Sequence, residues 1–327
     1  MISPVMAAFI LLAVLLLLHG DAAAAKSSDP CGPKSKRDPL TLRPDKITVL
    51  INGFSESRIP LLQSIAATYS LSPLVSSVII LWGNPSTPPH ILDQLSLNLS
   101  SAGPISILRQ TSGSLNARFL PRPDHIHTLA VLICDDDVEV DTVSFEFAFR
   151  VWSANNHRLI GLFARSHDLD LNRKEWLYTV HPDRFSIVLT KFMILNSDYL
   201  YKYSCEGGAR MAELRRVVDS ARNCEDILMN FVVADWNGVG PVLVGAEKVR
   251  DYGDARNDGD DEGRFSVGLS GGRRGRGEHR KRRGWCITEF HRVLGRMPLR
   301  YSYGKVVDSV GEQGLCQKSG KLVFCDQ

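Results

Sequence analysis

Short apolar runs alternate with amphipathic segments along the first half of this 327-residue chain. The apolar runs have the length of buried strands and occupy residues 47–51, 78–82, 105–108 and 128–134. Two segments between them, 60–69 and 88–99, repeat their apolar residues at helical spacing. This alternation predicts an α/β fold in which crossover helices join parallel strands. Ligands of such sheets bind beyond the carboxyl ends of the strands.

The second half of the chain has a less regular pattern. Helical spacing recurs at 142–154, 209–221 and 223–235, and strand-like runs occupy 159–163 and 186–189. The polar segment 165–183 has neither period, so we expect a long loop beside the ligand site. Between 251 and 283 the composition changes to Gly with blocks of acidic and then basic residues, which predicts a mobile loop.

The first residues differ from the rest of the chain in composition. Residues 5–18 are apolar and 22–25 are all Ala, which predicts a signal peptide or signal anchor over 1–25. The polar, Pro-containing segment 26–46 is typical of a short stem. The folded domain is then expected over 47–327. These expectations place it in the lumen of the secretory pathway.

Cysteines and one sequon fit a lumenal chain. Seven Cys residues in an oxidising compartment imply disulfides and at least one free thiol, for which we choose Cys134 because it lies inside an apolar run. Asn98, in Asn-Leu-Ser, is the obvious N-glycosylation sequon.

Composition and charge exclude some classes of protein. With 44% hydrophobic and 23% charged residues, the chain is expected to fold into a globular core. The net charge is +3, and the segment 273–283 carries seven Arg or Lys residues against one Glu, so the remainder is slightly acidic. A nucleic-acid-binding protein is expected to spread basic residues over a groove-sized face. Nucleic acid is therefore not an expected partner.

Three consecutive carboxylates, Asp135, Asp136 and Asp137, follow the apolar run at 128–134. They repel one another unless a positive partner joins them. Mn²⁺ and Mg²⁺ prefer oxygen ligands and take one or two carboxylates from a protein, which leaves positions for water and substrate phosphates. The triplet is therefore typical of an Asp-x-Asp nucleotide-sugar site. A helix cap or an exposed turn is the alternative explanation.

Several motifs occur in a recognisable order. They are SLNARFLP at 114–121, the Asp triplet, NCEDILMNF at 223–231, WCI at 285–287 and MPLRYS at 297–302. With these motifs the chain resembles glycosyltransferase family 64, the exostosin and exostosin-like enzymes, from about residue 47 to 302. The opening INGFSESRIPLL at 51–62 is most similar to the short plant members that act on inositolphosphoceramide sphingolipids.

The resemblance implies the A-type nucleotide-diphospho-sugar transferase fold, a Rossmann-like mixed sheet in a single catalytic domain, and retention of the donor's anomeric configuration. It also implies that Arg58, Asn84 and Arg118 contact the nucleotide. Gly113 stands where some animal members carry an Asn on the nucleotide, so the base of the donor stays open. The segment 165–183 is then expected to face the acceptor.

The Asp triplet matches the metal site of the family. By that match Asp137 and Asp135 are the metal or bridging carboxylates, and Asp136 lies nearer the donor sugar. The cofactor implied is Mn²⁺ or Mg²⁺.

Asp226 matches the carboxylate beside the anomeric carbon and is the residue to which we assign the chemistry. Cleavage of the sugar–phosphate bond builds positive charge on the ring and negative charge on the diphosphate, so the site needs a carboxylate and cations respectively. Arg283 is implied at the diphosphate. A helix N-cap with acidic residues in the first turn is the alternative explanation of residues 223–226.

The same match implies a disulfide between Cys224 and Cys286, which would bring Arg283 near the donor. Cys316 and Cys325 are close enough in sequence to pair, and Cys31 and Cys205 stay unassigned.

The leading hypothesis is a metal-dependent retaining glycosyltransferase of the Golgi lumen, anchored to the membrane or released by signal cleavage. Its donor would be GDP-mannose and its acceptor a glycosyl inositolphosphoceramide. One alternative is N-acetylhexosaminyl transfer from a UDP-sugar to a glycan or glycoprotein. Another is a lumenal binding protein without catalysis, against which the intact triplet and Asp226 argue.

Overall fold

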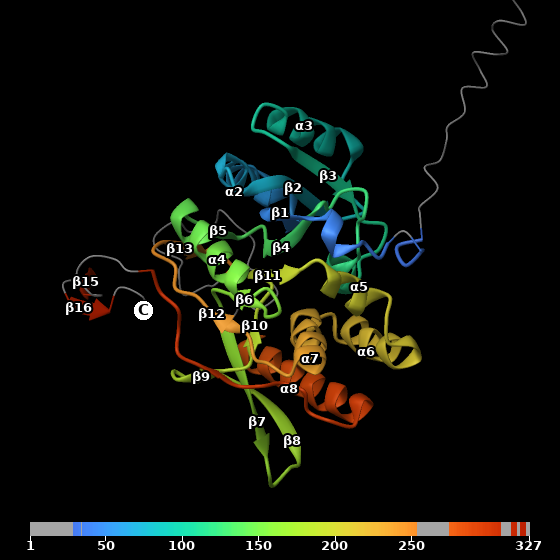
Figure 1. Ribbon diagram of the computed structural model, residues 1–327, viewed down its shortest axis with the longest axis vertical. Coiled ribbons are helices and arrows are strands. Elements are labelled where there is room, and N and C mark those ends of the chain that lie inside the picture. The colour runs from blue at the N-terminus through green and yellow to red at the C-terminus, as the bar shows by residue number, and fades with distance from the viewer. Residues whose placement is uncertain (1–28, 34, 254–274, 309–314, 319–320, 325–327) are drawn as a thin grey trace, which may run out of the picture.

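The structure is a computed structural model that describes residues 29–33, 35–253, 275–308, 315–318 and 321–324 (Figure 1). A seven-stranded sheet in the order β12-β6-β11-β4-β1-β2-β3 forms its centre. Four parallel strands make up one side of this sheet: β1 (Arg43–Gly53), β2 (Val75–Trp82), β3 (Ile105–Arg109) and β4 (Thr128–Asp135). These are the predicted strands; β1 and β2 are longer by several residues, and β3 and β4 by one residue each.

An antiparallel strand turns the sheet from parallel to mixed. β11 (Phe192–Asn196) runs antiparallel to both β4 and β6 (Ile160–Gly161), and β12 (Val242–Leu243) runs parallel to β6. The pattern did not predict β11. All of its first four residues are buried, so the strand shows no alternation of polar and apolar positions. The mixed α/β sheet confirms the predicted fold class.

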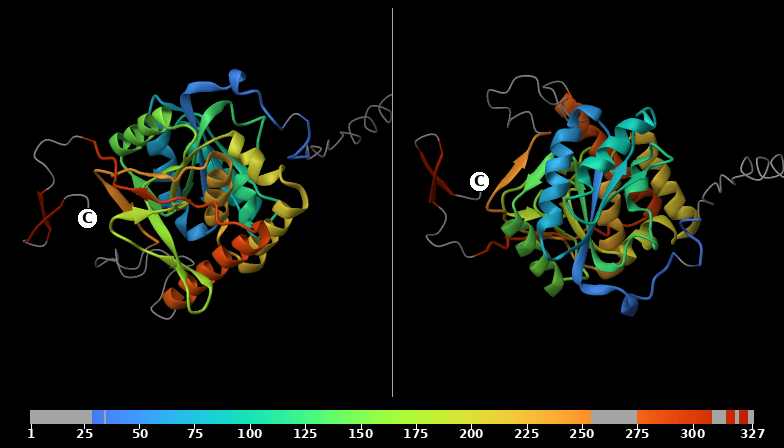
Figure 2. Two further views of the ribbon diagram at one scale, coloured as in Figure 1. Left: turned by 60° about the horizontal axis from the view of Figure 1, so that its bottom comes forward. Right: turned by 90° about the horizontal axis from the view of Figure 1, so that it is seen from above.

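Helices cover both faces of the sheet (Figure 2). One hydrophobic cluster joins alternate strand residues such as Val49 and Leu132 to α2 (Ile59–Leu71), α3 (Pro89–Leu99) and α4 (Thr142–Ala154). A second cluster joins the other strand face, including Leu50 and Ile133, to the C-terminal helices. These are α5 (Asp198–Ser204), α6 (Gly208–Ala221), α7 (Glu225–Asn237) and α8 (Gly275–Leu294). Since each strand is covered on both faces, the central runs are continuously apolar.

Short elements complete the described chain. The 3₁₀ helices are η1 (Pro39–Thr41), η2 (Glu56–Arg58) and η3 (Leu115–Phe119). The small strand pairs are β5 (Val138–Val140) with β13 (Val249–Asp251), β9 (Arg184–Phe185) with β14 (Ser302–Tyr303), and β15 (Leu315–Lys318) with β16 (Lys321–Phe324).

The segment predicted as a loop at 165–183 is a β-hairpin, so this prediction was wrong. β7 (Ala164–Asp170) pairs with β8 (Glu175–Thr179), and β10 (Ile187–Val188) adds a third strand on β7. The hairpin projects from the body in Figure 1, and β8 packs against α8. This contact is close at Gly284, where a Cβ atom would lie 2.9 Å from the carbonyl oxygen of Trp176. Packing on α8 therefore orders a segment whose sequence is polar.

The prediction of a mobile loop over 251–283 was also wrong at both of its ends. β13 extends to Asp251, and α8 begins at Gly275, so both ends of that segment are regular structure. Arg283, the last residue of the basic run, is only 6% exposed, because α8 packs this side chain into the protein. The segment 254–274 lies outside the described residues.

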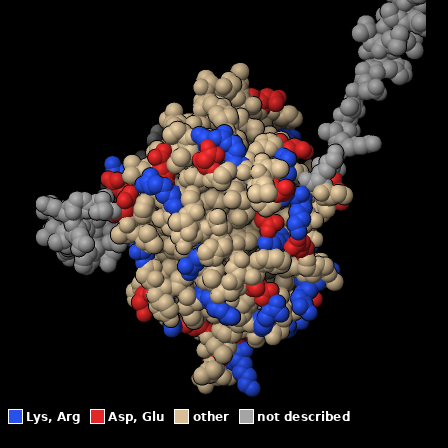
Figure 3. All heavy atoms as spheres, in the orientation of Figure 1, with Lys and Arg blue, Asp and Glu red and all other residues tan. Residues whose placement is uncertain are grey.

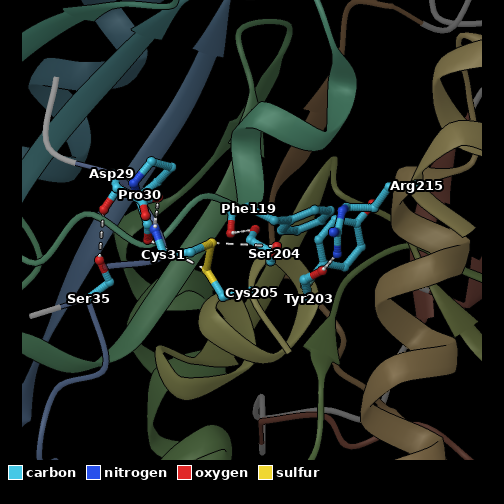
Figure 4. The surroundings of a disulfide bond; sticks show 9 residues. All are labelled: Asp29, Pro30, Cys31, Ser35, Phe119, Tyr203, Ser204, Cys205 and Arg215. Atoms are coloured by element: carbon cyan, nitrogen blue, oxygen red, sulfur yellow. Dashed lines mark hydrogen bonds between the residues drawn. A yellow bond between two sulfur atoms is a disulfide. The ribbon is translucent and has the colours of Figure 1, made fainter. Parts of the chain in front are cut away.

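The expected stem at 26–46 is attached to the domain (Figure 4). Cys31 forms a disulfide with Cys205 at the end of α5, and β1 begins at Arg43, inside the expected stem. Ser35 is buried, and its hydroxyl donates a hydrogen bond of 3.3 Å to the carbonyl oxygen of Asp29. The domain thus begins earlier than residue 47.

Several other expectations concern the ends and the surface of the chain. The segment 1–25 and Cys325, the expected partner of Cys316, lie outside the described residues. Asn98 is exposed in the last turn of α3. Within the described part, no helix is long and apolar enough to span a bilayer. Basic and acidic side chains are interspersed on the face shown in Figure 3.

Candidate active site

A cavity of about 960 Å³ opens at the carboxyl ends of β1 and β4. Its wall includes Arg58, Arg118 and the three aspartates, Asp135, Asp136 and Asp137. The register of the sheet explains why residues that follow β1 and β4 line the same cavity, because Asn52 at the end of β1 lies opposite Asp135 at the end of β4. A volume of this size accommodates a nucleotide-sized ligand. Five of the residues predicted for the donor and metal therefore line one cavity.

Arg58 pairs with two of the aspartates. It lies in η2, just after β1, and its Nη1 atom is 2.9 Å from Asp136 Oδ1 and 3.1 Å from Asp137 Oδ2. The amide of Phe54 donates a further hydrogen bond of 3.3 Å to Asp136 Oδ2. Burial raises the pKa of the Asp136 carboxyl, and the charge of Arg58 opposes this effect. The guanidinium thus keeps two neighbouring carboxylates together.

Arg118 connects the Asp triplet with helix α7. Its Nη1 atom lies 3.2 Å from Asp135 Oδ1 and 3.1 Å from Glu225 Oε1, and it donates a 2.7 Å hydrogen bond to the hydroxyl of Thr190. Burial raises the pKa of Glu225. Sequence reasoning treated Glu225 only as an acid in the first turn of a helix. Its place beside Asp226 in the NCED motif was the available signal.

The chemistry of the Asp triplet suits a divalent cation. Asp137 Oδ1 is buried and has no hydrogen-bond partner among the described residues. Burial, followed by the negative charge of Asp135, raises the pKa of Asp137 to about 7. Both observations indicate a carboxylate with too little positive charge around it. Asp137 and Asp135 therefore fit the role of oxygen ligands to Mn²⁺ or Mg²⁺.

The rest of a coordination shell is not built by the described residues. Among them, no group of three or more His, Cys, Asp or Glu side chains could hold a metal ion. A donor set of one or two carboxylates completed by water and phosphate oxygens is nevertheless usual for Mg²⁺.

Lys191 is a cavity residue that sequence reasoning missed. It lies between β10 and β11 and pairs with Asp251, and its positive charge opposes the rise that burial causes in the pKa of Asp137. Gly253 lines the cavity beside Asp137, and any Cβ atom at this position would collide with the carboxylate of Asp137. No local pattern identifies either residue, because only the tertiary fold brings them to the end of β4.

Asn84, which was predicted to contact the nucleotide, is not among the residues that line the cavity. Its neighbours Gly83 and Pro85 are in the cavity wall, and its Oδ1 atom accepts a 2.9 Å hydrogen bond from the amide of Ser86. The side chain thus shapes the turn after β2 in this structure.

Asp226 and Arg283 form a buried ion pair behind the cavity. Arg283 Nη2 is 2.6 Å from Asp226 Oδ2, and the two side chains are only 7% and 4% exposed. Arg283 Nη1 also donates a 2.9 Å hydrogen bond to Asn223 Oδ1, and its guanidinium lies 4.4 Å from the ring centre of Tyr178. Neither Asp226 nor Arg283 is among the residues that line the cavity. Their neighbour Glu225 contacts Arg118, which does line the cavity.

The disulfide between Cys224 and Cys286 holds this pair in place, as the resemblance predicted. Cys224 is the N-cap of α7 and adopts a left-handed conformation with φ of 78°, and Arg222 has φ of 47°. Non-glycine residues in this region are uncommon and cost free energy. Glu225 and Asp226 occupy the first turn of α7, and Asn223 lies outside the helix.

The structure also shows the states of Cys134, Cys31 and Cys205. Cys134 is buried and free, as predicted from its apolar surroundings. Cys31 and Cys205, which sequence reasoning left unassigned, are bonded to each other.

Residues 47–311 match the family model described as "Glycosyl transferase family 64 domain". The chain is 63% identical to "Glycosyltransferase family protein 64 C3" of Arabidopsis thaliana over 303 residues, which cover 91% of both chains. It is 34% identical to mouse "Exostosin-1" over 212 residues, 63% of this chain and 27% of that protein. The chain thus aligns with about a quarter of the exostosin.

Among solved structures, the chain is similar to the "Crystal structure of GalNAc-T7 with UDP, GalNAc and Mn2+". The TM-score is 0.41 and the identity 10%, over 64% of this chain and 44% of the other. Such a distant likeness does not transfer a ligand or a metal to this protein.

Proposed function

Because the chain belongs to glycosyltransferase family 64 and is a glycosyltransferase, we propose that it transfers the sugar of a nucleotide-diphosphate donor with retention and with the help of Mn²⁺ or Mg²⁺. The observation that carries this proposal is the cavity at the ends of β1 and β4, lined by Arg58, Arg118 and the Asp triplet. Its two arginines suit a diphosphate, and its aspartates suit a hard cation.

The diphosphate of the donor would lie beside the part of the cavity wall that Arg58, Arg118 and the Asp triplet form. Arg58 and Arg118 would contact the phosphates, and Asp137 with Asp135 would hold the cation. When bound, this cation supplies positive charge that stabilises the leaving diphosphate. Asp136, paired with Arg58, lies next to these groups and would orient the donor sugar. Asn84, between the lining residues Gly83 and Pro85, would contact the nucleotide.

Asp226 is the proposed catalytic residue. Its carboxylate would stabilise the positive charge that develops on the sugar ring as the bond to the phosphate breaks. The ion pair with Arg283 fixes the direction of the Asp226 carboxylate. Arg283 would supply positive charge to the leaving diphosphate. These assignments are supported by the connection from Asp135 through Arg118 to Glu225, the neighbour of Asp226.

We propose GDP-mannose as the donor and a glycosyl inositolphosphoceramide as the acceptor. The segment INGFSESRIPLL at 51–62, which resembles the short plant members, supports this choice, and the relative that is 63% identical is also a plant protein. N-acetylhexosaminyl transfer from a UDP-sugar remains the second candidate, which the 34% identity to exostosin-1 favours.

The protein is proposed to work in the Golgi lumen, with residues 1–25 as signal peptide or signal anchor. The two disulfides among the described residues support this, since such bonds form in oxidising compartments. The catalytic domain is proposed to extend to residue 327.

Hydrolysis of a panel of nucleotide sugars by the purified protein tests the proposed function. We expect release of GDP from GDP-mannose in Mn²⁺, and none in excess chelator. Faster hydrolysis of UDP-N-acetylhexosamines would favour the second candidate. Hydrolysis of none of the sugars, with and without glycolipid acceptor, would contradict donor use.

A further inference from the structure

Asp219 on α6 is a carboxylate in the cavity wall that the proposed mechanism does not use. Its Oδ1 atom accepts hydrogen bonds from the hydroxyl of Ser114 and, at 2.9 Å, from Asn116 Nδ2. No described residue donates a hydrogen bond to its Oδ2 atom or forms an ion pair with it. Asp219 is exposed to the cavity mouth, so this second oxygen can accept hydrogen bonds from a ligand.

A buried network fixes the direction of this carboxylate. Asn116 is 9% exposed, and its Nδ2 atom also donates to the carbonyl oxygen of Arg215, at 3.0 Å. The buried hydroxyl of Tyr203 donates a 2.5 Å hydrogen bond to Asn116 Oδ1. Figure 4 shows Arg215 donating in turn to the carbonyl oxygen of Tyr203, at 2.6 Å. Because α5, α6 and η3 all contribute, the carboxylate is held in place before a ligand binds.

Open space lies beside the same carboxylate. Gly113 precedes Ser114 and lines the cavity, and a Cβ atom built on it would meet no atom within 4 Å. The cavity is therefore wide at the position next to Asp219, where a two-ring base has room.

The distance from the charged wall is suitable for a nucleoside diphosphate. Ser114 is the N-cap of η3, and Arg118 lies in its last turn. Since a 3₁₀ helix rises about 2 Å per residue, the two residues are separated by roughly 8 Å along the cavity wall. A ribose and its first phosphate fill such a gap. A diphosphate at Arg118 would therefore place the base near Ser114, whose hydroxyl donates to Asp219.

We propose that Asp219 is a base-selecting residue and that it favours guanine nucleotides. Guanine presents two adjacent donors, the ring N1–H and the 2-amino group, to the free carboxylate oxygen. Uracil has a single ring donor between two carbonyl oxygens, which a carboxylate repels. Adenine has an acceptor where guanine has N1–H. The selection is therefore made by both attraction and repulsion. This inference rests on the proposed function, because it assigns the base end of the donor site.

Calorimetric titration of the full protein in Mn²⁺ with GDP, IDP, UDP and ADP tests the inference. IDP is guanosine diphosphate without the 2-amino group, so the ratio of GDP to IDP affinity measures that contact. We expect GDP to bind most tightly, and Asp219→Asn to weaken GDP by at least about tenfold while changing UDP little. Glu213→Gln, on the same helix but paired with Arg292 at the surface, is the control and should leave all four affinities unchanged.

A second variant keeps the test independent of the network around Asp219. Gly113→Asn would fill the open space and should weaken GDP more than UDP. Equal affinity of the parent for GDP and IDP, or an equal loss of GDP and UDP in Asp219→Asn, would overturn the base assignment. Tighter binding of UDP than of GDP would also overturn it, but would leave the transferase function intact. Failure of all four nucleotides to bind would refute the proposed function together with this inference.

Discussion

The two groups of carboxylates in the candidate site differ in their access to the cavity. Asp135 at the end of β4 is 26% exposed and Asp137 just after it is 7% exposed, but both line the open cavity. Asp226 lies in the first turn of helix α7, is 4% exposed, is paired with a buried arginine and does not line the cavity. Carboxylates of the open group can exchange an arginine partner for a cation from solvent. A buried pair cannot be separated without leaving a charge in a medium of low dielectric constant.

Because of this difference, substitutions in the two groups are expected to have different effects on ligand binding and on stability. Changes in the open group should affect ligand binding while the protein stays folded. Changes in the buried group should affect folding and turnover together.

Asp226→Asn is expected to lower turnover by on the order of 10²- to 10³-fold, because it removes the charge opposite the cationic sugar. It should also destabilise the protein by about 3 kcal/mol, since Arg283 is left buried without a charged partner. Steady-state kinetics and denaturant unfolding on one preparation measure both effects.

The double variant Asp226→Asn with Arg283→Gln is the control for this change. It removes both charges, so it should recover most of the stability without recovering turnover. An Asp226→Asn enzyme with turnover within a few-fold of the parent would refute the catalytic assignment and favour a role in the helix only.

Asp137→Asn is expected to abolish cation-dependent binding of the donor while the protein stays folded. In the parent, Mn²⁺ should raise the melting temperature, because a ligand that binds only the folded state stabilises it. In the variant this increase should disappear. Asp235→Asn, which removes a surface pair with Arg296, is the matched control. An undiminished Mn²⁺ shift in Asp137→Asn would exclude this carboxylate as a ligand.

Cys286→Ser is expected to lower both stability and turnover. The bond to Cys224 joins residues 62 apart in sequence, and chain-entropy estimates for a loop of this size give about 4 kcal/mol. Cys31→Ser is the control, because its disulfide lies outside the site and its loss should leave turnover unchanged. Unfolding curves and kinetics measure the two effects. Parental turnover in Cys286→Ser would mean that the bond does not position Arg283.

His167→Gln is expected to change how stability depends on pH. Burial lowers the pKa of His167 from 6.5 to about 4, so the unfolded chain binds the proton more tightly. Stability should therefore fall as pH falls from about 6.5 through 4, by up to about 1.4 kcal/mol per pH unit for this group. The variant should have a smaller slope in that window.

His279 keeps a slope in the variant, because burial also lowers its pKa to about 4. Denaturant unfolding between pH 4 and 8 measures the difference. Identical slopes in parent and variant would show that His167 does not contribute to acid sensitivity.

The two groups also differ in how far local sequence predicted them. The Asp triplet follows an apolar strand, and the rule that ligands bind at the carboxyl ends of parallel strands placed it at a site. Asp226 lies in a helix-start pattern that any capped helix could show, and only the resemblance to a family distinguished it. Its burial beside Arg283 was not predictable from the pattern, because the two residues are 57 positions apart.

The sequence alone determined the strands β1 to β4, the helices between them and the position of the Asp triplet. Apolar periodicity is a local property, so it predicts these elements without any knowledge of contacts with distant residues. The tertiary structure decided the antiparallel strand β11, the hairpin at 165–183, and the helical end of the basic run. In each of these, contacts with distant residues outweigh local preference, as where β8 packs on α8 and Arg283 reaches Asp226.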